Sequence, residues 1–242
     1  MKKKIGNQSF WVGGKNSCLT IIHKKNRNIE KCFCTETFAL KNDLTSISYE
    51  LKNNKEISKC FSPTFNHQGI ALKVSKLKTY NIKELFLISE NMRSIIILDG
   101  VSDQGNIGSI IRSSAAFGVD AIIVDKKNFN QKSFVCIKSA SGAIENINII
   151  ETSNIKNDIK FLKKKDFWIY ALSSKAINSF HKENFNKKKV FIFGSEEKGL
   201  KNNTLKLCDN ILKIDIDKKT ESLNVANAVS ACLYGLRVLN NI

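Results

Sequence analysis

Three short clusters in the second half of the chain carry the side chains best suited to chemistry. They run from Asn106 to Arg112, from Phe193 to Leu200 and from Thr220 to Val225. Each follows a stretch that predicts a strand, and the ends of such strands form the ligand-binding edge of an open α/β sheet. Together they offer amides, hydroxyls, a carboxylate and a guanidinium, which can hold a polar ligand and stabilise negative charge.

Each cluster also has a purely structural interpretation. Asn106 could cap the following helix, and Gly108 could serve only close packing. Gly194 could supply an unusual φ at a strand-to-helix turn. Ser222 or Asn224 could cap the last helix. One cluster taken alone leaves both interpretations open.

Several kinds of site are excluded by spacing. The glycines Gly194 and Gly199 imitate a phosphate loop, but Leu200 and Lys201 follow where a nucleoside triphosphate site needs Lys and Ser or Thr. No GxGxxG follows a strand, which argues against a dinucleotide site. The seven cysteines have no CxxC spacing and the three histidines stand apart from them, so we expect no metal.

The composition points to a polyanionic partner. The 242-residue chain has a formal net charge of +17, which suits phosphate contacts, although solubility or a low-GC codon bias could also explain the excess of lysine. Arginine occurs at only four positions, so Arg112 within the first cluster stands out.

The expected compartment is the cytoplasm. The cysteines are odd in number and lie mostly in apolar runs, as do small buried hydrophobic residues in a reducing environment. No signal sequence is evident and no window approaches eighteen apolar residues, so we expect no membrane association.

The second half alternates between strand and helix patterns. Predicted strands lie at 95–98, 121–124, 147–150, 168–171, 190–193 and 211–216, with helices near 107–117, 136–142, 155–165 and 224–239. This alternation predicts a parallel sheet with helices on both faces. The last helix is nearly apolar and rich in small residues, which predicts tight packing against another helix.

The first third predicts a separate, smaller α/β domain over residues 8–76, preceded by a basic tail. A short helix should follow Trp11, with strands at 30–35, 46–51 and 69–74 and a helix near 36–42. Residues 77–92 read as a linker with a marginal helix, and residues 93–242 as the second domain.

The clusters resemble known signature motifs when they are taken together. NxGxxxR (Asn106 to Arg112), GxExxGL (Gly194 to Leu200) and SLNV (Ser222 to Val225) are similar, in this order, to the three motifs of the SpoU/TrmH (SPOUT) family of RNA ribose 2′-O-methyltransferases. KSASGAIE (Lys138 to Glu145) also resembles the family. HQGIAL (His67 to Leu72) resembles the end of the substrate-binding domain in its RlmB-type, 23S rRNA guanosine branch.

The resemblance implies a fold and a cofactor. The expected architecture is an L30e-like RNA-binding domain followed by a trefoil-knotted α/β domain, assembled as a homodimer whose active site draws on both subunits. S-adenosylmethionine would contact the knot loops at Gly194, Ile214 and Leu223. Asp215 departs from the pattern, because relatives often have proline there, and this puts the rigidity of that loop in question.

The resemblance also implies a catalytic group. Its members would be Asn106, Arg112, Glu196, Ser222 and Asn224. The family assigns proton acceptance to the arginine, but a guanidinium is protonated at neutral pH. We therefore expect Arg112 to stabilise the developing alkoxide and a nearby RNA phosphate.

The expected substrate is a ribose 2′-hydroxyl, most plausibly in a guanosine of 23S rRNA, with no role for DNA. Two alternatives stay open. The first is a tRNA guanosine 2′-O-methyltransferase, although that branch generally lacks the amino-terminal domain. The second is a catalytically silent RNA-binding protein that acts in ribosome assembly.

Overall fold

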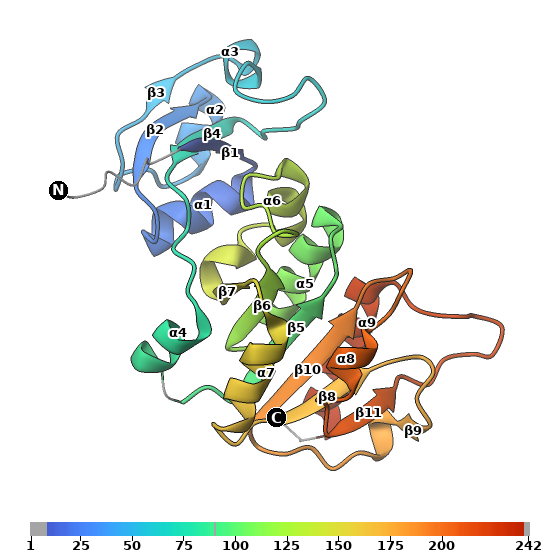
Figure 1. Cartoon of the computed structure of the whole chain (residues 1–242). Helices are drawn as coiled ribbons and strands as arrows, with labels where there is room; N and C mark the ends of the chain where they lie inside the picture. Colours follow the sequence, from blue (N-terminus) through green and yellow to red (C-terminus); the bar gives the residue numbers. More distant parts are fainter. Residues whose placement is uncertain (1–8, 90, 240–242) are drawn as a thin grey trace.

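A seven-stranded parallel sheet forms the centre of the larger part of the protein. In a computed structural model that describes residues 9–89 and 91–239, its strand order is β7-β6-β5-β10-β8-β11-β9 (Figure 1). The strands are β5 (Ser94–Asp99), β6 (Ala121–Asp125), β7 (Asn148–Thr152), β8 (Trp168–Leu172), β9 (Asn178–Ser179), β10 (Lys189–Gly194) and β11 (Asn210–Lys213). Every neighbouring pair is parallel, so the carboxyl ends of all strands meet at one edge.

Helices cover both faces of this sheet, as the alternating pattern predicts. Along β5, Ile96 and Leu98 belong to one apolar core, and Ile95 and Ile97 belong to the other. The helices are α4 (Ile82–Ile88), α5 (Gln104–Ala116), α6 (Phe134–Ala140), α7 (Ile155–Lys163), α8 (Asn202–Leu205) and α9 (Val225–Leu239). Two short 3-10 turns are η1 (Ala143–Asn146) and η2 (Phe180–Lys182).

The packing of α9 confirms the expectation drawn from its small residues. It lies against α5, and the hydroxyls of Ser113 and Ser230 are 2.7 Å apart across that contact. Gly108 on the same α5 is a packing residue, because a Cβ there would overlap the carbonyl of Cys136 and the side chain of Ser139. The packing interpretation of Gly108 is therefore correct.

A second, four-stranded sheet lies in the first third of the chain, in the order β1-β4-β2-β3. Its strands are β1 (Phe10–Gly13), β2 (Ile29–Cys34), β3 (Glu50–Leu51) and β4 (Ile70–Val74), and its helices are α1 (Lys15–Lys24), α2 (Glu36–Lys41) and α3 (Asn54–Ser58). The apolar core lies on the face where β2 presents Cys32 and Cys34. The predicted tail at residues 1–8 lies outside the described residues. Strand β1 was not predicted from the sequence.

Two predicted strands are shorter than expected. Only Glu50–Leu51 of the stretch 46–51 is a strand, since Ile47 before it packs on the core from a bent segment. The stretch 211–216 leaves the sheet after Lys213. Its period-two pattern arises because Ile214 and Ile216 line a cavity instead of a sheet face.

The HQGI stretch is a structural turn. His67 is buried and its Nδ1 accepts a hydrogen bond from the backbone N–H of Gly69 at 3.1 Å, while Nε2 lies 3.2 Å from the hydroxyl of Ser58. Burial lowers the pKa of His67 below its ordinary value. Gly69 has a φ of +81°, which favours glycine.

A buried ion pair joins the part of the chain around the four-stranded sheet to the part around the seven-stranded sheet. Arg27, between α1 and β2, donates through Nη2 and Nε to Oε1 of Glu145 in η1 at 2.7 and 2.8 Å. The two side chains are 2% and 1% exposed. Asn26 adds a hydrogen bond from Nδ2 to the carbonyl of Glu145 at 2.9 Å. Glu145, the one acidic residue of the KSASGAIE stretch, therefore links the part of the chain around the first sheet to the larger part.

The segment between the domains docks on the larger sheet. Tyr80 forms a parallel bridge with Ile150, and Leu85 on α4 is fully buried in one of the sheet's cores. Of the helices within residues 9–89 and 91–239, none combines the length and apolar character required to cross a membrane.

The ion pair gives a testable expectation for stability. Glu145→Met leaves the Arg27 guanidinium buried without its partner, so the free energy of unfolding should fall by about 3–5 kcal/mol. The double variant Arg27→Met/Glu145→Met, which removes both charges, should recover part of that loss. Urea unfolding of both variants checks this, and a double variant less stable than the single one contradicts it.

Candidate active site

One carboxylate oxygen joins the three sequence clusters. Oε1 of Glu196 accepts hydrogen bonds from Nδ2 of Asn224 at 2.6 Å and from Nδ2 of Asn106 at 3.2 Å. Asn224 Nδ2 also lies 3.0 Å from Oδ1 of Asn106. These side chains come from the start of α5, the loop after β10 and the residue before α9. Segments up to 118 positions apart thus meet at the carboxyl edge of the sheet.

The start of α9 explains why Asn224 and Glu196 occupy these positions. Asn224 caps the helix, because its Oδ1 accepts from the backbone N–H groups of Ala226 and Asn227 at 2.9 and 3.3 Å. Its Nδ2 is then directed to Glu196. The N–H of Val225 also donates to Glu196 Oε1 at 3.3 Å, so the carboxylate lies at the positive end of the helix dipole.

The capping interpretations are resolved differently for the three residues. Asn224 caps its helix and also joins the cluster, so both of its interpretations hold. Asn106 does not cap α5; the cap is Asp103, whose Oδ1 accepts from the N–H of Asn106 at 2.7 Å. Ser222 is exposed and caps nothing, and it lies at the cavity described next.

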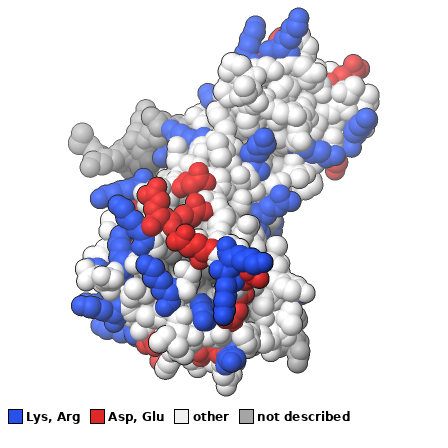
Figure 2. All heavy atoms as spheres, turned by 90° about the vertical axis from the view of Figure 1, so that its right-hand side faces the viewer, with Lys and Arg blue, Asp and Glu red and all other residues white. Residues whose placement is uncertain are grey.

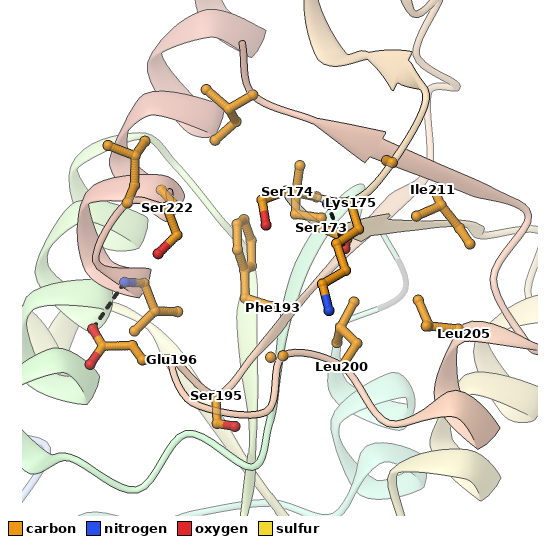
Figure 3. A pocket seen from close by; sticks show the side chains of 18 of the residues that line it. Ser173, Ser174, Lys175, Phe193, Ser195, Glu196, Leu200, Leu205, Ile211 and Ser222 are labelled. Carbon is orange, nitrogen blue, oxygen red and sulfur yellow. Dashed lines mark hydrogen bonds between the residues drawn. The ribbon is translucent and has the colours of Figure 1, made fainter. Parts of the chain in front are cut away.

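A cavity of about 870 Å³ opens beside the cluster. Its lining includes the three predicted cofactor residues and two of the predicted catalytic residues, namely Gly194, Ile214, Leu223, Glu196 and Ser222. Figure 3 shows Ser222 and Ser174 directed into the cavity from opposite sides of Phe193, with Lys175 reaching toward Leu200. The size and the mixture of apolar and polar lining fit a small organic ligand.

Gly194 is required by a close approach. Its φ is not positive, so the predicted unusual φ is wrong. A Cβ at Gly194 would instead overlap the backbone of Gly199 and Leu200, where the loop folds back beside the end of β10. Gly199 supplies the left-handed turn, with a φ of +63°. This close approach shapes one wall of the cavity.

The cavity lining also includes backbone donors. The N–H groups of Ser222 and Leu223 donate no hydrogen bond within the part of the chain that the structure describes. Oε2 of Glu196 likewise accepts none from the described residues. A ligand with hydrogen-bond acceptors at one end and a positive charge at the other matches this set of groups.

Three polar residues at the site, Asp99, Ser173 and Ser174, were not predicted from the sequence. Asp99, at the end of β5, is 2% exposed; its carboxylate accepts from Oγ1 of Thr204 at 2.7 Å and pairs with Nζ of Lys201 at 3.0 Å. It therefore holds the chain that follows the Glu196 loop. Ser173 and Ser174 also line the cavity. In each case a polar residue at the end of a strand was the available signal.

Asp215 ties down the loop in which relatives often have proline. Its carboxylate accepts from the hydroxyl of Ser179 at 3.0 Å and pairs with Nδ1 of His181 at 2.8 Å. The Ser179 hydrogen bond is the main cause that lowers the pKa of Asp215. These side-chain contacts hold Asp215, next to Ile214, in place. Proline at this position would restrict the backbone through its ring instead.

Arg112 lies apart from the cluster. It follows Asn106 on α5 by about 9 Å of helix rise and about 120° of rotation. Its side chain is exposed and has no hydrogen bond or ion pair with any described residue. Of the five predicted catalytic residues, the fold therefore gathers four and leaves Arg112 on the outer side of α5.

The comparisons with known proteins agree with the motifs. Residues 93–234 match the model described as the SpoU rRNA Methylase family. The 23S rRNA (guanosine-2′-O-)-methyltransferase RlmB of Yersinia pestis is 30% identical over 170 residues, which cover 69% of each chain.

Solved structures extend the similarity in fold. The AdoMet-bound rRNA methyltransferase from Sinorhizobium meliloti superposes with a TM-score of 0.79 at 20% identity, over 96% of this chain and 87% of that one. The A. aeolicus TrmH/SpoU tRNA modifying enzyme has a TM-score of 0.54 at 22% identity, over 62% of this chain and 77% of that one.

The two roles of Asn224 can be separated by substitution. Asn224→Ser keeps an oxygen that can cap α9 and removes the amide donors, whereas Asn224→Ala removes both. The alanine variant should therefore be less stable than the serine variant by about 1 kcal/mol in urea unfolding. Equal stabilities would show that Asn224 does not cap the helix.

Proposed function

Because this chain belongs to the SpoU rRNA methylase family, we propose that it transfers a methyl group from S-adenosylmethionine to a ribose 2′-hydroxyl of RNA. The target we propose is a guanosine of 23S rRNA, as in the RlmB relative. The observation that carries this proposal is the junction of all three motifs at Glu196 Oε1, directly beside a cavity of cofactor size.

The cavity fits the proposed cofactor chemically. S-adenosylmethionine supplies an activated methyl on a positively charged sulfonium, together with an adenine that offers hydrogen-bond acceptors. Leu223 and Ser222 would meet the adenine end with their free backbone N–H groups, and Gly194 and Ile214 would form the adjoining walls. Carboxylates at the cavity, including Glu196, Glu197 and Glu221, favour a cation.

The surface charge separates the two ligands. Figure 2 shows acidic side chains gathered at the centre of one face, with lysines and arginines around them. The acidic centre suits a cationic cofactor, and the basic surroundings suit the phosphates of RNA. The net charge of +17 thus coexists with carboxylates at the cavity, among them Glu196, Glu197 and Glu221.

The residues of the cluster would act mainly by positioning. Asn106 and Asn224, fixed by Glu196, would hold the ribose in line with the methyl group, with Ser222 at the cavity edge. Arg112 would stabilise the alkoxide that develops on the 2′-oxygen and bind the neighbouring phosphate. The proton would leave to that phosphate or to water, since a guanidinium stays protonated at neutral pH.

Arg112 would reach the site from a second copy of the chain. On α9, Ala231, Tyr234 and Val238 form an exposed stripe at helical spacing. Tyr234 and Val238 are 61% and 54% exposed, so the stripe offers apolar surface for a second subunit to cover. Arg112 is exposed on the adjoining α5. A homodimer formed through this face would bury the stripe and carry Arg112 to the partner's cluster.

The domain assignment completes the proposal. Residues 8–76 would form an L30e-like RNA-binding domain, 77–92 a linker and 93–242 the methyltransferase domain with its trefoil knot. In support of the knot, the segment after β11 returns past the Glu196 loop to place α9 against α5. The rRNA target is favoured over tRNA because the rRNA enzyme superposes on 96% of the chain and the tRNA enzyme on 62%.

Methyl transfer from labelled S-adenosylmethionine, followed by mass-spectrometric mapping of ribose methylation, tests the function. The purified protein should methylate one guanosine in 23S rRNA and leave tRNA unmodified. Transfer to tRNA alone would favour the tRNA enzyme. Absence of transfer together with absence of cofactor binding would favour the catalytically silent RNA-binding protein.

Arg112→Ala tests the proposed role of Arg112 in the same assay. The variant should lose nearly all methyl transfer, about 100-fold or more, because the developing alkoxide loses its positive partner. Its affinity for S-adenosylmethionine, measured by calorimetry, should be unchanged, because Arg112 does not line the cavity. If the affinity for the cofactor falls instead, the proposed role of Arg112 is wrong.

A further inference from the structure

One face of the amino-terminal sheet carries aromatic and basic side chains together. We propose that this face binds unpaired RNA bases, which stack on Trp11 and Phe33 while nearby lysines contact the phosphates. We call these two rings and Lys31, Lys52 and Lys73 the aromatic-basic face. The inference rests on the proposed function in that the partner is the RNA to be methylated.

The pleat of the strands places these residues on the side away from the core. Cys32 and Cys34 on β2 and Val12 on β1 are buried in the domain core, so Phe33 and Trp11 between them point to the other side. The two ring centroids are 5.0 Å apart at an interplanar angle of 35°. Both side chains are partly exposed. Packing in the domain core therefore does not explain why large aromatic side chains occur at these two positions.

The strand between them lets the rings meet. β4 lies between β1 and β2 and pairs Ala71 with Phe33. The small side chain of Ala71 leaves room above the sheet for two large rings. Elsewhere on this face, Phe61 and Phe65 cover Gly13, where a Cβ would meet both of their rings. Trp11 and Phe33 stay partly exposed.

Basic side chains surround the rings. Lys73 lies opposite both Trp11 and Lys31 in the register of the sheet. The ammonium of Lys52 lies 5.7 Å from the centre of the Phe33 ring. Lys73 and Lys52 are 3.5 and 3.4 Å from carboxylates of Glu30 and Glu50, but Lys31 has no ion pair with any described residue. Lys31 thus provides a positive charge beside the rings.

This combination fits single-stranded RNA better than a duplex. Bases stack on aromatic side chains only when they are unpaired, and each stacked base contributes affinity with little dependence on sequence. A flat sheet face offers no projection that could enter the narrow major groove of an RNA helix. The indole N–H of Trp11 has no partner among the described residues and can donate to a base or phosphate.

Tryptophan fluorescence can report on this contact directly. The chain has two tryptophans, so Trp168→Phe leaves Trp11 as the single reporter. Titration of this full-length variant with a single-stranded oligoribonucleotide, without cofactor, should quench the emission. The same sequence in a perfect duplex should quench it much less. Equal quenching by both forms, or none by the single strand, overturns the proposal.

Substitutions then measure the contribution of the face. Trp11→Leu and Phe33→Leu keep an apolar side chain but remove stacking, so each should weaken binding of the oligonucleotide about tenfold. Trp168→Leu, at an exposed tryptophan on β8, is the matched control and should leave the affinity unchanged. Lys31→Ala should lower the slope of log affinity against log salt by about 0.7, as expected for one phosphate contact.

Methyl transfer measured in parallel separates this inference from the proposed function. If the wild-type protein methylates rRNA while Trp11→Leu and Phe33→Leu bind and methylate normally, the aromatic-basic face is not a binding surface and the function stands. If the wild-type protein binds the oligonucleotide through Trp11 but transfers no methyl, the face stands and the function fails. Circular dichroism confirms that both leucine variants are folded.

Discussion

The hydrogen bonds to Oε1 of Glu196 hold the candidate site together. Three donors from α5, from the residue before α9 and from the first N–H of α9 converge on this one oxygen. A carboxylate is suited to this task because it accepts several hydrogen bonds and is stabilised by the positive end of a helix. Each cluster alone is only a polar turn beside a strand. Their junction places the side-chain amides of Asn106 and Asn224 next to the cavity, where we propose that they position the ribose.

The remaining anchors support this junction from outside. Asp99 holds the chain that follows the Glu196 loop, and Asp215 holds the loop at Ile214. Arg27 and Glu145 form a buried pair that links the part of the chain around the first sheet to the larger part. In our proposal, RNA bound to the amino-terminal sheet reaches the methyl-transfer site across this contact.

Local sequence patterns predicted most of the second domain. The strands were visible because runs such as Ile95 to Leu98 are continuous and apolar, and α9 because small apolar residues repeat along it. Longer-range features were not predictable. Asp99 and Thr204 are 105 residues apart, and Arg27 and Glu145 are 118 apart. The local sequence around one residue of each pair therefore gives no sign of its partner. The position of Arg112 depends on helix rotation and, in our proposal, on a second subunit.

Mixed dimers test most directly whether the site combines the Glu196 cluster of one subunit with Arg112 of the other, as we propose. Chains carrying Arg112→Ala and chains carrying Asn224→Ser are each expected to be inactive as homodimers. When the two are unfolded together and refolded in equal amounts, one site in each mixed dimer keeps both residues. Random pairing predicts about a quarter of the wild-type methyl-transfer activity. No activity in the mixture, with mixed dimers shown to form, would contradict the shared site.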